Sequence, residues 1–134
     1  MRVILDTNVF VSGIFFTGPP HQILKAWYDG KLQLVISPEI FSEYLRVGVT
    51  LAEQFPPVDL GKILELVKNK AIMVDAPPLP EQICSDPDDD KFLACAFVSK
   101  CNLIVSGDKH LLQVSGHNGI NVLKPRPFVD KYLP

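Results

Sequence analysis

The sequence predicts an α/β protein in which a central parallel β-sheet is flanked by α-helices. Its 134 residues are enough for one compact domain, which we expect to span residues 1–134. Several short apolar runs, beginning with residues 2–5, are rich in branched residues and lack polar alternation, as is typical of strands covered on both faces. Segments with helical spacing of apolar residues separate these runs, and this alternation is the pattern of α/β folds.

The boundaries of the elements follow from local start and stop signals. The expected strands are residues 2–5, 32–36, 71–74, 103–105 and 120–123. The expected helices are residues 23–28, 37–47, 58–70, 92–97 and 109–114. The Asp-Gly pair at 29–30 ends the first helix, and Ser37 followed by Pro38 is a typical start for the second. The Phe-Pro-Pro run at 55–57 interrupts helical spacing before the third helix.

The second half of the chain is organised around two polar segments. The proline-rich stretch 76–80 is expected to be a surface connection that is too short to link two domains. The acidic cluster 86–90 precedes the helix at 92–97, where the helix dipole favours negative charge. The Ser-Gly-Asp run at 106–108 closes the strand before it, and Pro125 follows the last strand.

Composition and charge exclude several classes of protein. Thirteen basic and fifteen acidic residues give a formal net charge of −2, so attraction of nucleic acid by bulk positive charge is excluded and any such site must be local. No apolar run approaches the roughly 20 residues that span a bilayer, and we expect a cytosolic protein without a membrane segment. Cys84, Cys95 and Cys101 form no C-x-x-C pair and are expected to be free thiols.

Carboxylates recur at positions that a parallel sheet would bring together. The four candidate site residues are Asp6, Glu43, Asp90 and Asp108. Asp6 and Asp108 follow predicted strands, and the carboxyl ends of parallel strands border the functional crevice of open sheets. Glu43 lies in the helix after the second strand and Asp90 at the start of a later helix, so both can reach the same edge. One pocket would then hold four acids.

Such a pocket is unfavourable without a cation, because like charges a few ångströms apart raise one another's pKa values. Carboxylates without His or Cys are hard oxygen ligands suited to Mg²⁺ or Mn²⁺. These ions lower the pKa of a bound water and neutralise charge on a phosphate, so hydrolysis of a phosphodiester is the expected chemistry. Thr7, Asn8 and Ser106 are expected to support the carboxylates or a phosphate oxygen. Lys91 and Arg46 are among the candidate contacts to the phosphate backbone, although exposed Lys and Arg side chains usually only keep the protein surface hydrated.

The acidic cluster 86–90 is also similar in part to a calcium-binding loop. Asp86, Asp88 and Asp90 imitate the first ligands of an EF-hand, but Lys91 and Phe97 stand where that loop requires Gly and Glu. Asp86 and Asp88 are more typical of caps or solvated charges, and whether either joins the site stays open at this point. A binding module that holds RNA or a protein in the crevice without cleaving it is a second functional alternative.

The start of the chain, Val-Ile-Leu-Asp-Thr-Asn at 3–8, is also similar to that of haloacid-dehalogenase-like phosphatases. Those enzymes carry a nucleophilic Asp and a second Asp two positions later. Here the second position is Asn8. The phosphatase is therefore an alternative to the nuclease.

The order of the acids resembles that of PIN-domain nucleases over nearly the whole chain. Asp6-Thr7-Asn8 repeats the end of that family's first strand, and Glu43 matches the acid in the helix after the second strand. The run from Asp90 to Ala94 matches a helix that opens with an acid, and Asp108 matches an acid after the next strand. The neighbouring Asp86, Asp88 and Asp89 depart from the pattern. Helix phase favours Asp90 over them, because it lies three residues before Leu93 in the apolar stripe.

The resemblance implies a Mg²⁺- or Mn²⁺-dependent ribonuclease, with VapC-like toxins of bacterial toxin-antitoxin pairs as the most similar branch. It further implies an RNA substrate, a small antitoxin protein as partner and a possible homodimer. Apolar residues at 15–16 and 128–133 could form such an interface or be buried within the chain.

Overall fold

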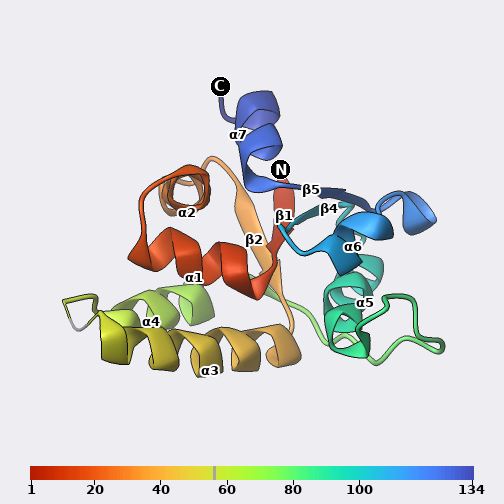
Figure 1. Cartoon of the computed structure of the whole chain (residues 1–134), viewed down its shortest axis with the longest axis horizontal. Coiled ribbons are helices and arrows are strands. Elements are labelled where there is room, and N and C mark those ends of the chain that lie inside the picture. Colours follow the sequence, from red (N-terminus) through yellow and green to blue (C-terminus); the bar gives the residue numbers. More distant parts are fainter. Residues whose placement is uncertain (56) are drawn as a thin grey trace.

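A five-stranded parallel sheet forms the centre of the computed structural model, which describes residues 1–55 and 57–134 (Figure 1). The strands of this described part are β1 (Arg2–Leu5), β2 (Gln33–Ile36), β3 (Ile72–Met73), β4 (Leu103–Val105) and β5 (Asn121–Leu123). Their order is β3-β2-β1-β4-β5, and every neighbouring pair is parallel. The predicted α/β class is confirmed.

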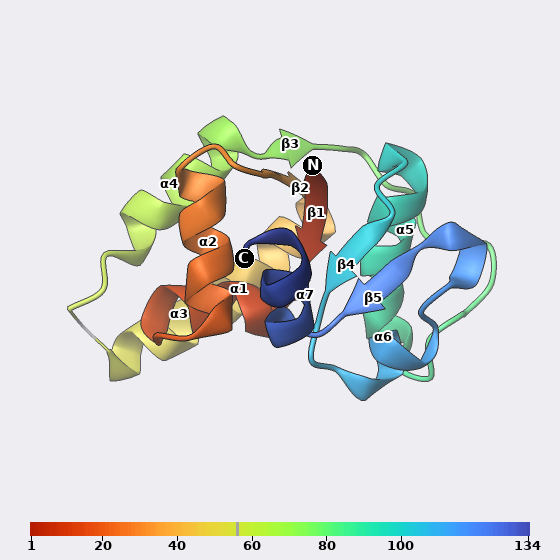
Figure 2. The ribbon, with the colours of Figure 1, turned by 90° about the horizontal axis from the view of Figure 1, so that it is seen from above.

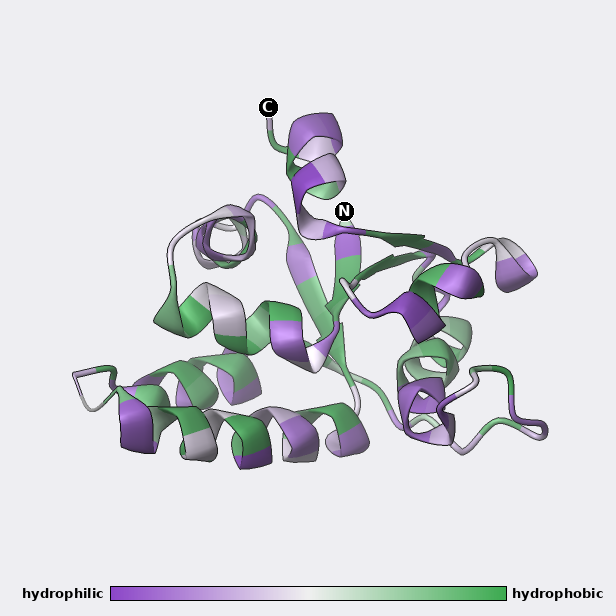
Figure 3. Ribbon diagram, viewed as in Figure 1, coloured by the Kyte–Doolittle hydropathy of each residue, from purple (hydrophilic) through white to green (hydrophobic). Residues whose placement is uncertain are grey.

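The helices connect and cover these strands. They are α1 (Thr7–Phe15), α2 (Pro19–Tyr28), α3 (Pro38–Gln54), α4 (Leu60–Lys70), α5 (Asp90–Ser99), α6 (Lys109–Gln113) and α7 (Pro125–Tyr132), with short 3₁₀ turns η1 (Pro87–Asp89) and η2 (His117–Gly119). Figures 1 and 2 both show α1 to α4 gathered on one side of β1, with α5 and α6 beside β4 and β5. Figure 3 shows hydrophobic residues along the strands and purple, hydrophilic turns on the outer helices, as expected for a core centred on the sheet.

Two helices were not predicted from the sequence. Helix α1 is apolar nearly throughout and is buried against α2 and α3, so it lacks the alternating polar face that identifies a surface helix. Helix α7 begins with Pro125, whose fixed φ suits the first helical position. The apolar residues Phe128 and Val129 of this helix are buried within the chain, whereas Phe16 is exposed.

The predicted start of α3 at Ser37 is observed, whereas α2 and α5 begin earlier than expected, at Pro19 and Asp90. The Ser37 hydroxyl accepts a hydrogen bond from the amide of Ile40, at 3.3 Å, and caps α3. Helix α4 begins at Leu60 and not at residue 58, because the Asp59 side chain caps it. Helix α3 ends at Gln54, and Pro56 of the predicted break lies outside the described residues. Among the residues that the structure describes, no helix is both long enough and apolar enough to cross a membrane.

Tyr44 fixes α3 against the end of β1. Its side chain is fully buried and stacks on Phe10 of α1, with ring centroids 4.0 Å apart and planes inclined by 6°. Its hydroxyl donates a hydrogen bond to the carbonyl of Leu5, so a buried polar group gains a partner at the last residue of β1. Because Glu43 precedes Tyr44 and Asp6 follows Leu5, this contact also sets how the two acids lie relative to each other.

Gly13 allows α1 and α2 to approach closely. A Cβ atom at this position would lie 2.7 Å from Leu24 Cδ1 and 2.7 Å from the carbonyl oxygen of Pro20. The backbone oxygen cannot move aside as the end of a side chain can. A larger residue would therefore push the two helices apart.

The substitution Gly13→Ala is expected to lower the free energy of unfolding by about 1–3 kcal/mol, as overpacking of a close contact does. Urea unfolding followed by circular dichroism measures this change. Gly61→Ala is the matched control, because the nearest atom to its new Cβ, Asp59 Oδ1, is 3.6 Å away in a helix exposed to solvent. The control should be unchanged or up to about 1 kcal/mol more stable, since Ala favours helix over Gly. Equal effects in both variants would contradict the proposed contact.

Candidate active site

The carboxyl ends of β1 and β4 bring Asp6 and Ser106 together. The amide of Asp6 donates to the carbonyl of Val105 at 2.9 Å, which continues the parallel pairing by one residue. The Ser106 hydroxyl then donates to Asp6 Oδ2 at 2.6 Å, and both side chains are buried. Asp6 precedes α1 without capping it through its side chain, so its carboxylate remains directed to the sheet edge. This is the crevice in which open α/β sheets bind ligands.

Asp108 joins the same edge through Ser106. Its amide donates to the Ser106 hydroxyl oxygen at 2.9 Å, so that one hydroxyl links the backbone of Asp108 to the carboxylate of Asp6. Asp108 Oδ1 accepts the amide of His110 at 2.7 Å and caps α6. The predicted supporting role of Ser106 therefore has a structural basis in these two hydrogen bonds.

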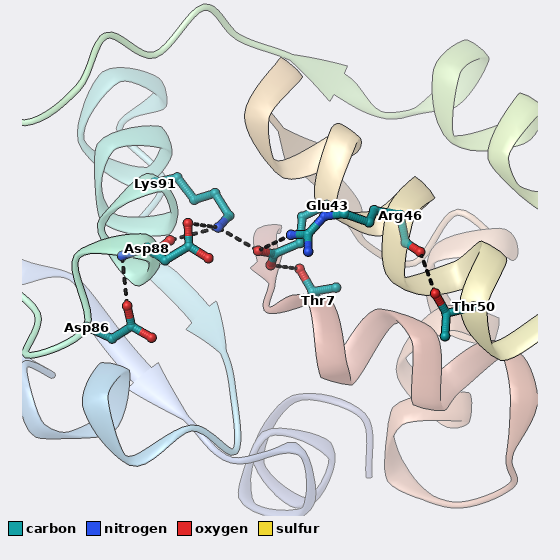
Figure 4. Close-up of polar contacts among 7 residues, drawn as sticks. All are labelled: Thr7, Glu43, Arg46, Thr50, Asp86, Asp88 and Lys91. Atoms are coloured by element: carbon teal, nitrogen blue, oxygen red, sulfur yellow. Dashed lines mark hydrogen bonds and ion pairs between the residues drawn. The ribbon is translucent and has the colours of Figure 1, made fainter.

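Glu43 reaches the site from the second turn of α3. Thr7, the first residue of α1, donates its hydroxyl to Glu43 Oε1. The other oxygen, Oε2, lies 2.7 Å from Lys91 Nζ and 3.5 Å from Arg46 Nη2 (Figure 4). The Glu43 side chain is only 14% exposed. The predicted supporting residue Asn8, in contrast, is exposed to solvent.

The acidic cluster divides into residues with different tasks. Asp90 Oδ2 accepts the amide of Ile83 at 3.0 Å and its Oδ1 accepts the amide of Cys84 at 2.7 Å, so this carboxylate is turned toward the preceding loop. Asp86 accepts the amide of Asp88 at 3.0 Å and caps η1, and Asp88 is exposed. The structure therefore ties the predicted residue Asp90 to the loop backbone, and Asp86 performs the capping role that the sequence suggested.

Asp89 is the member of the cluster whose charge is coupled to those of Asp6 and Asp108. Its Oδ2 atom is buried and has no hydrogen-bond partner among the described residues. The pKa of Asp89 is raised to about 7, first by burial and then by the charges of Asp108 and Asp6, against a smaller lowering by Lys91. A carboxylate that responds to both acids lies within their electrostatic reach.

Helix phase did not identify Asp89 because α5 begins only at Asp90. Residues 87–89 form a 3₁₀ turn, so the α-helical periodicity cannot be extended backward through them. The Asp86-Pro87 pair was the available signal, since it is typical of a separate capped turn.

The charges of Asp108 and Glu43 act on Asp6 in the same direction. The pKa of Asp6 is raised, mainly by burial, with added contributions from the charges of Asp108 and Glu43. The hydrogen bond from Ser106 and the backbone amide of Thr7 offset part of this change. The ionised form of Asp6 is thus stabilised by donors but destabilised by its acidic neighbours.

The donor set of this site fits a hard divalent cation. Within residues 1–55 and 57–134, no three His, Cys, Asp or Glu side chains already converge closely enough to surround a metal ion. The chemistry of the donors nevertheless suits Mg²⁺ or Mn²⁺, because Asp6, Asp89 and Asp108 supply only oxygen atoms and one of these is buried without a partner. A cation here would offset both the burial and the repulsion that raise the pKa values of Asp6 and Asp89.

A cleft of about 740 Å³ opens beside this site. Its walls come from α3, the start of α5 and the proline-rich stretch 76–82. Glu43 and Lys91 line it, together with Arg46 and Asp88. The cleft gives a large ligand access to the Glu43 side of the acidic residues.

The raised pKa of Asp89 predicts how pH affects stability. In the unfolded chain this carboxyl has a pKa of 3.8, so a folded value of about 7 means that stability is lost as the pH rises through that interval. With a chelator present, Asp89→Asn should melt at a higher temperature than the parent at about pH 8, because the cost of burying a charge and its repulsion by Asp108 and Asp6 are both removed. The difference should shrink on acidification to about pH 5, where the parent is protonated.

Thermal melts of both proteins across this pH range measure the effect, with the exposed Asp130→Asn as the control for loss of one charge. A stabilisation by Asp89→Asn that grows on acidification would contradict this explanation.

Comparisons with known proteins agree with the geometry of the site. The profile of the PIN domain family matches residues 2–110, a span that includes Asp6, Glu43, Asp89 and Asp108. An uncharacterized protein of Methanocaldococcus jannaschii, MJ1680, is 28% identical over 147 residues, which cover 98% of this chain and 92% of that protein. PIN domains are generally nucleases that use divalent metal ions, and the match favours a nuclease over the haloacid-dehalogenase-like phosphatase. The chain belongs to the PIN domain family.

Proposed function

We propose that this protein is a Mg²⁺- or Mn²⁺-dependent endoribonuclease whose metal centre is built on Asp6, Asp89 and Asp108. The observation that carries this proposal is the state of Asp89, which has a buried, unpartnered oxygen and a pKa raised by burial and by the charges of Asp108 and Asp6. Asp89 takes the place that the sequence suggested for Asp90, because both oxygens of Asp90 are bound to loop amides. Glu43 completes the acidic set on the side of the cleft.

Each side chain has a distinct task in this proposal. Ser106 orients the Asp6 carboxylate and the backbone of Asp108 through its two hydrogen bonds. Thr7 holds Glu43 at the mouth of the cleft. When bound, the divalent ion supplies an activated water and neutralises charge on the phosphodiester. The protein contributes the positions of the carboxylates and a partly enclosed setting in which their charges act strongly.

The RNA substrate is proposed to enter through the cleft of about 740 Å³. The net charge of −2 gives no general attraction for RNA, so binding depends on local cations. Arg46 and Lys91 line the cleft next to Glu43 and are the cations that its walls supply. Single-stranded segments suit such a site, because their backbone can bend to present one phosphate at a time.

Two neighbouring acids test the assignment of the metal centre. Asp89→Asn is expected to reduce Mn²⁺-dependent cleavage of a labelled RNA by roughly 100-fold or more, because a ligand charge is lost. Asp90→Asn is the matched variant, with the same chemical change one residue away. It should retain cleavage within about threefold, since its role is to bind backbone amides and Asn keeps one acceptor oxygen.

The opposite ranking, with Asp90→Asn inactive and Asp89→Asn active, would return the metal ligand to Asp90. Addition of a chelator separates the nuclease from the non-catalytic alternative. A nuclease loses cleavage in the chelator, whereas a binding module retains RNA in the chelator and cleaves it under no divalent ion.

We further propose that the nuclease is the toxin of a toxin-antitoxin pair, a role supported by the resemblance described above. Expression of the parent in a bacterial host should arrest growth, and Asp6→Asn should relieve the arrest because cleavage is lost. Co-expression of a small adjacent reading frame should also relieve it, through binding of an antitoxin. Unimpaired growth with active, well-expressed parent protein would favour a housekeeping nuclease instead.

A further inference from the structure

Lys91 places an enclosed positive charge at the edge of the acidic site. It lies in the first turn of α5, and its side chain is 15% exposed. Its Nζ atom is 2.7 Å from Glu43 Oε2, 2.7 Å from the carbonyl oxygen of Asp88 and 3.5 Å from Asp88 Oδ1 (Figure 4). The ammonium group therefore has three oxygen partners and little access to water, so it is held in place.

Arg46 does not play an equivalent part. It lies 3.5 Å from the same Glu43 oxygen, but its side chain is 71% exposed and its charge is screened by solvent. Glu43 Oε1 is already engaged by the Thr7 hydroxyl. Lys91 is consequently the cation that balances Glu43, and it occupies the oxygen that would otherwise be available to a metal ion.

The ion pair between Lys91 and Glu43 divides the acids of the site into those with a cationic partner and those without one. Glu43 has an ammonium partner, while Asp6 and Asp89 form no ion pair among the described residues. A divalent ion at the three aspartates would attract Glu43 and repel Lys91, because an ammonium and a metal ion cannot share one carboxylate oxygen without strong repulsion. The metal-free protein is thus stabilised by a contact that metal binding must break or weaken.

We propose that Lys91 is a built-in competitor of the divalent ion for Glu43, and that it thereby sets the affinity of the site for the metal. This inference rests on the proposed function, since it takes the three aspartates as the metal centre. Lys91 is a positioning residue in this role, because it acts on Glu43 and not on the reacting atoms. Its removal frees Glu43 to approach the ion.

Calorimetric titration of Mn²⁺ into the metal-free protein tests the proposal without reference to activity. Lys91→Met is expected to bind Mn²⁺ roughly tenfold more tightly than the parent, because one competing charge is removed from a partly buried carboxylate. Lys91→Arg keeps the charge and should bind within about threefold of the parent. Lys31→Met is the control for net charge, since it is exposed and precedes β2 at the amino end of the sheet, opposite the site.

A second pair of variants distinguishes competition for Glu43 from a general effect of charge. In the Glu43→Gln background there is no carboxylate to compete for, so adding Lys91→Met should change the affinity for Mn²⁺ by less than about threefold. A tenfold gain in affinity for Mn²⁺ that persists in the Glu43→Gln background would overturn the proposal. Such a gain would come from the charge of Lys91 acting directly on the metal ion and not from competition for Glu43. Equal or weaker binding by Lys91→Met alone would also overturn it.

The design separates this inference from the proposed function. If the parent binds Mn²⁺ and cleaves RNA while Lys91→Met binds as the parent does, the inference alone fails. If neither protein binds Mn²⁺, the proposed metal centre fails with it. Thermal melts confirm that each variant is folded, and Lys91→Gln replaces Lys91→Met with the same expectation if the latter unfolds at the temperature of the titration.

Discussion

The parallel pairing of β1 with both β2 and β4 is the constraint on which the site depends. Because β1 is central and all of its neighbours run in the same direction, their carboxyl ends meet at one edge of the sheet. The residues that follow these strands are polar and include Asp6 and Ser106. Strand pairing in the core thus brings Asp6 and Asp108, which are distant in sequence, within electrostatic reach of each other, and their negative charges repel.

The molecule offsets this repulsion with donors of different kinds. Ser106 donates to Asp6, Thr7 donates to Glu43, and Lys91 pairs with the second oxygen of Glu43. Asp89 alone retains a buried oxygen without a partner among the described residues, and its raised pKa reflects that exception. The arrangement is compatible with a folded metal-free state yet leaves negative charge that is not balanced by donors, and this charge suits the cation proposed for the site.

Buried contacts behind the site give the acids their fixed positions. Tyr44 joins α3 to Leu5 by a hydrogen bond and stacks on Phe10, so the acids on either side of these contacts cannot move independently. Asp90 also stabilises the surroundings of the site. Its carboxylate accepts hydrogen bonds from the amides of Ile83 and Cys84 and thereby attaches the loop before α5 to that helix. A carboxylate near the proposed metal centre can therefore be structural, and its hydrogen-bond partners distinguish it from a candidate ligand.

The sequence by itself determined the class of fold, the five strands and the acids at the ends of β1 and β4. These features depend on local composition, since a branched apolar run, a Ser-Pro helix start and an Asp after a strand are each readable from a few residues. Helix α1 was not readable in this way, because a helix buried on most sides has no polar face to mark its period. The tertiary structure decided what each member of the acidic cluster binds. A 3₁₀ turn before α5 leaves Asp89 with a buried oxygen that has no partner among the described residues and turns Asp90 to the loop amides, and this division depends on packing and hydrogen bonds that no local pattern encodes.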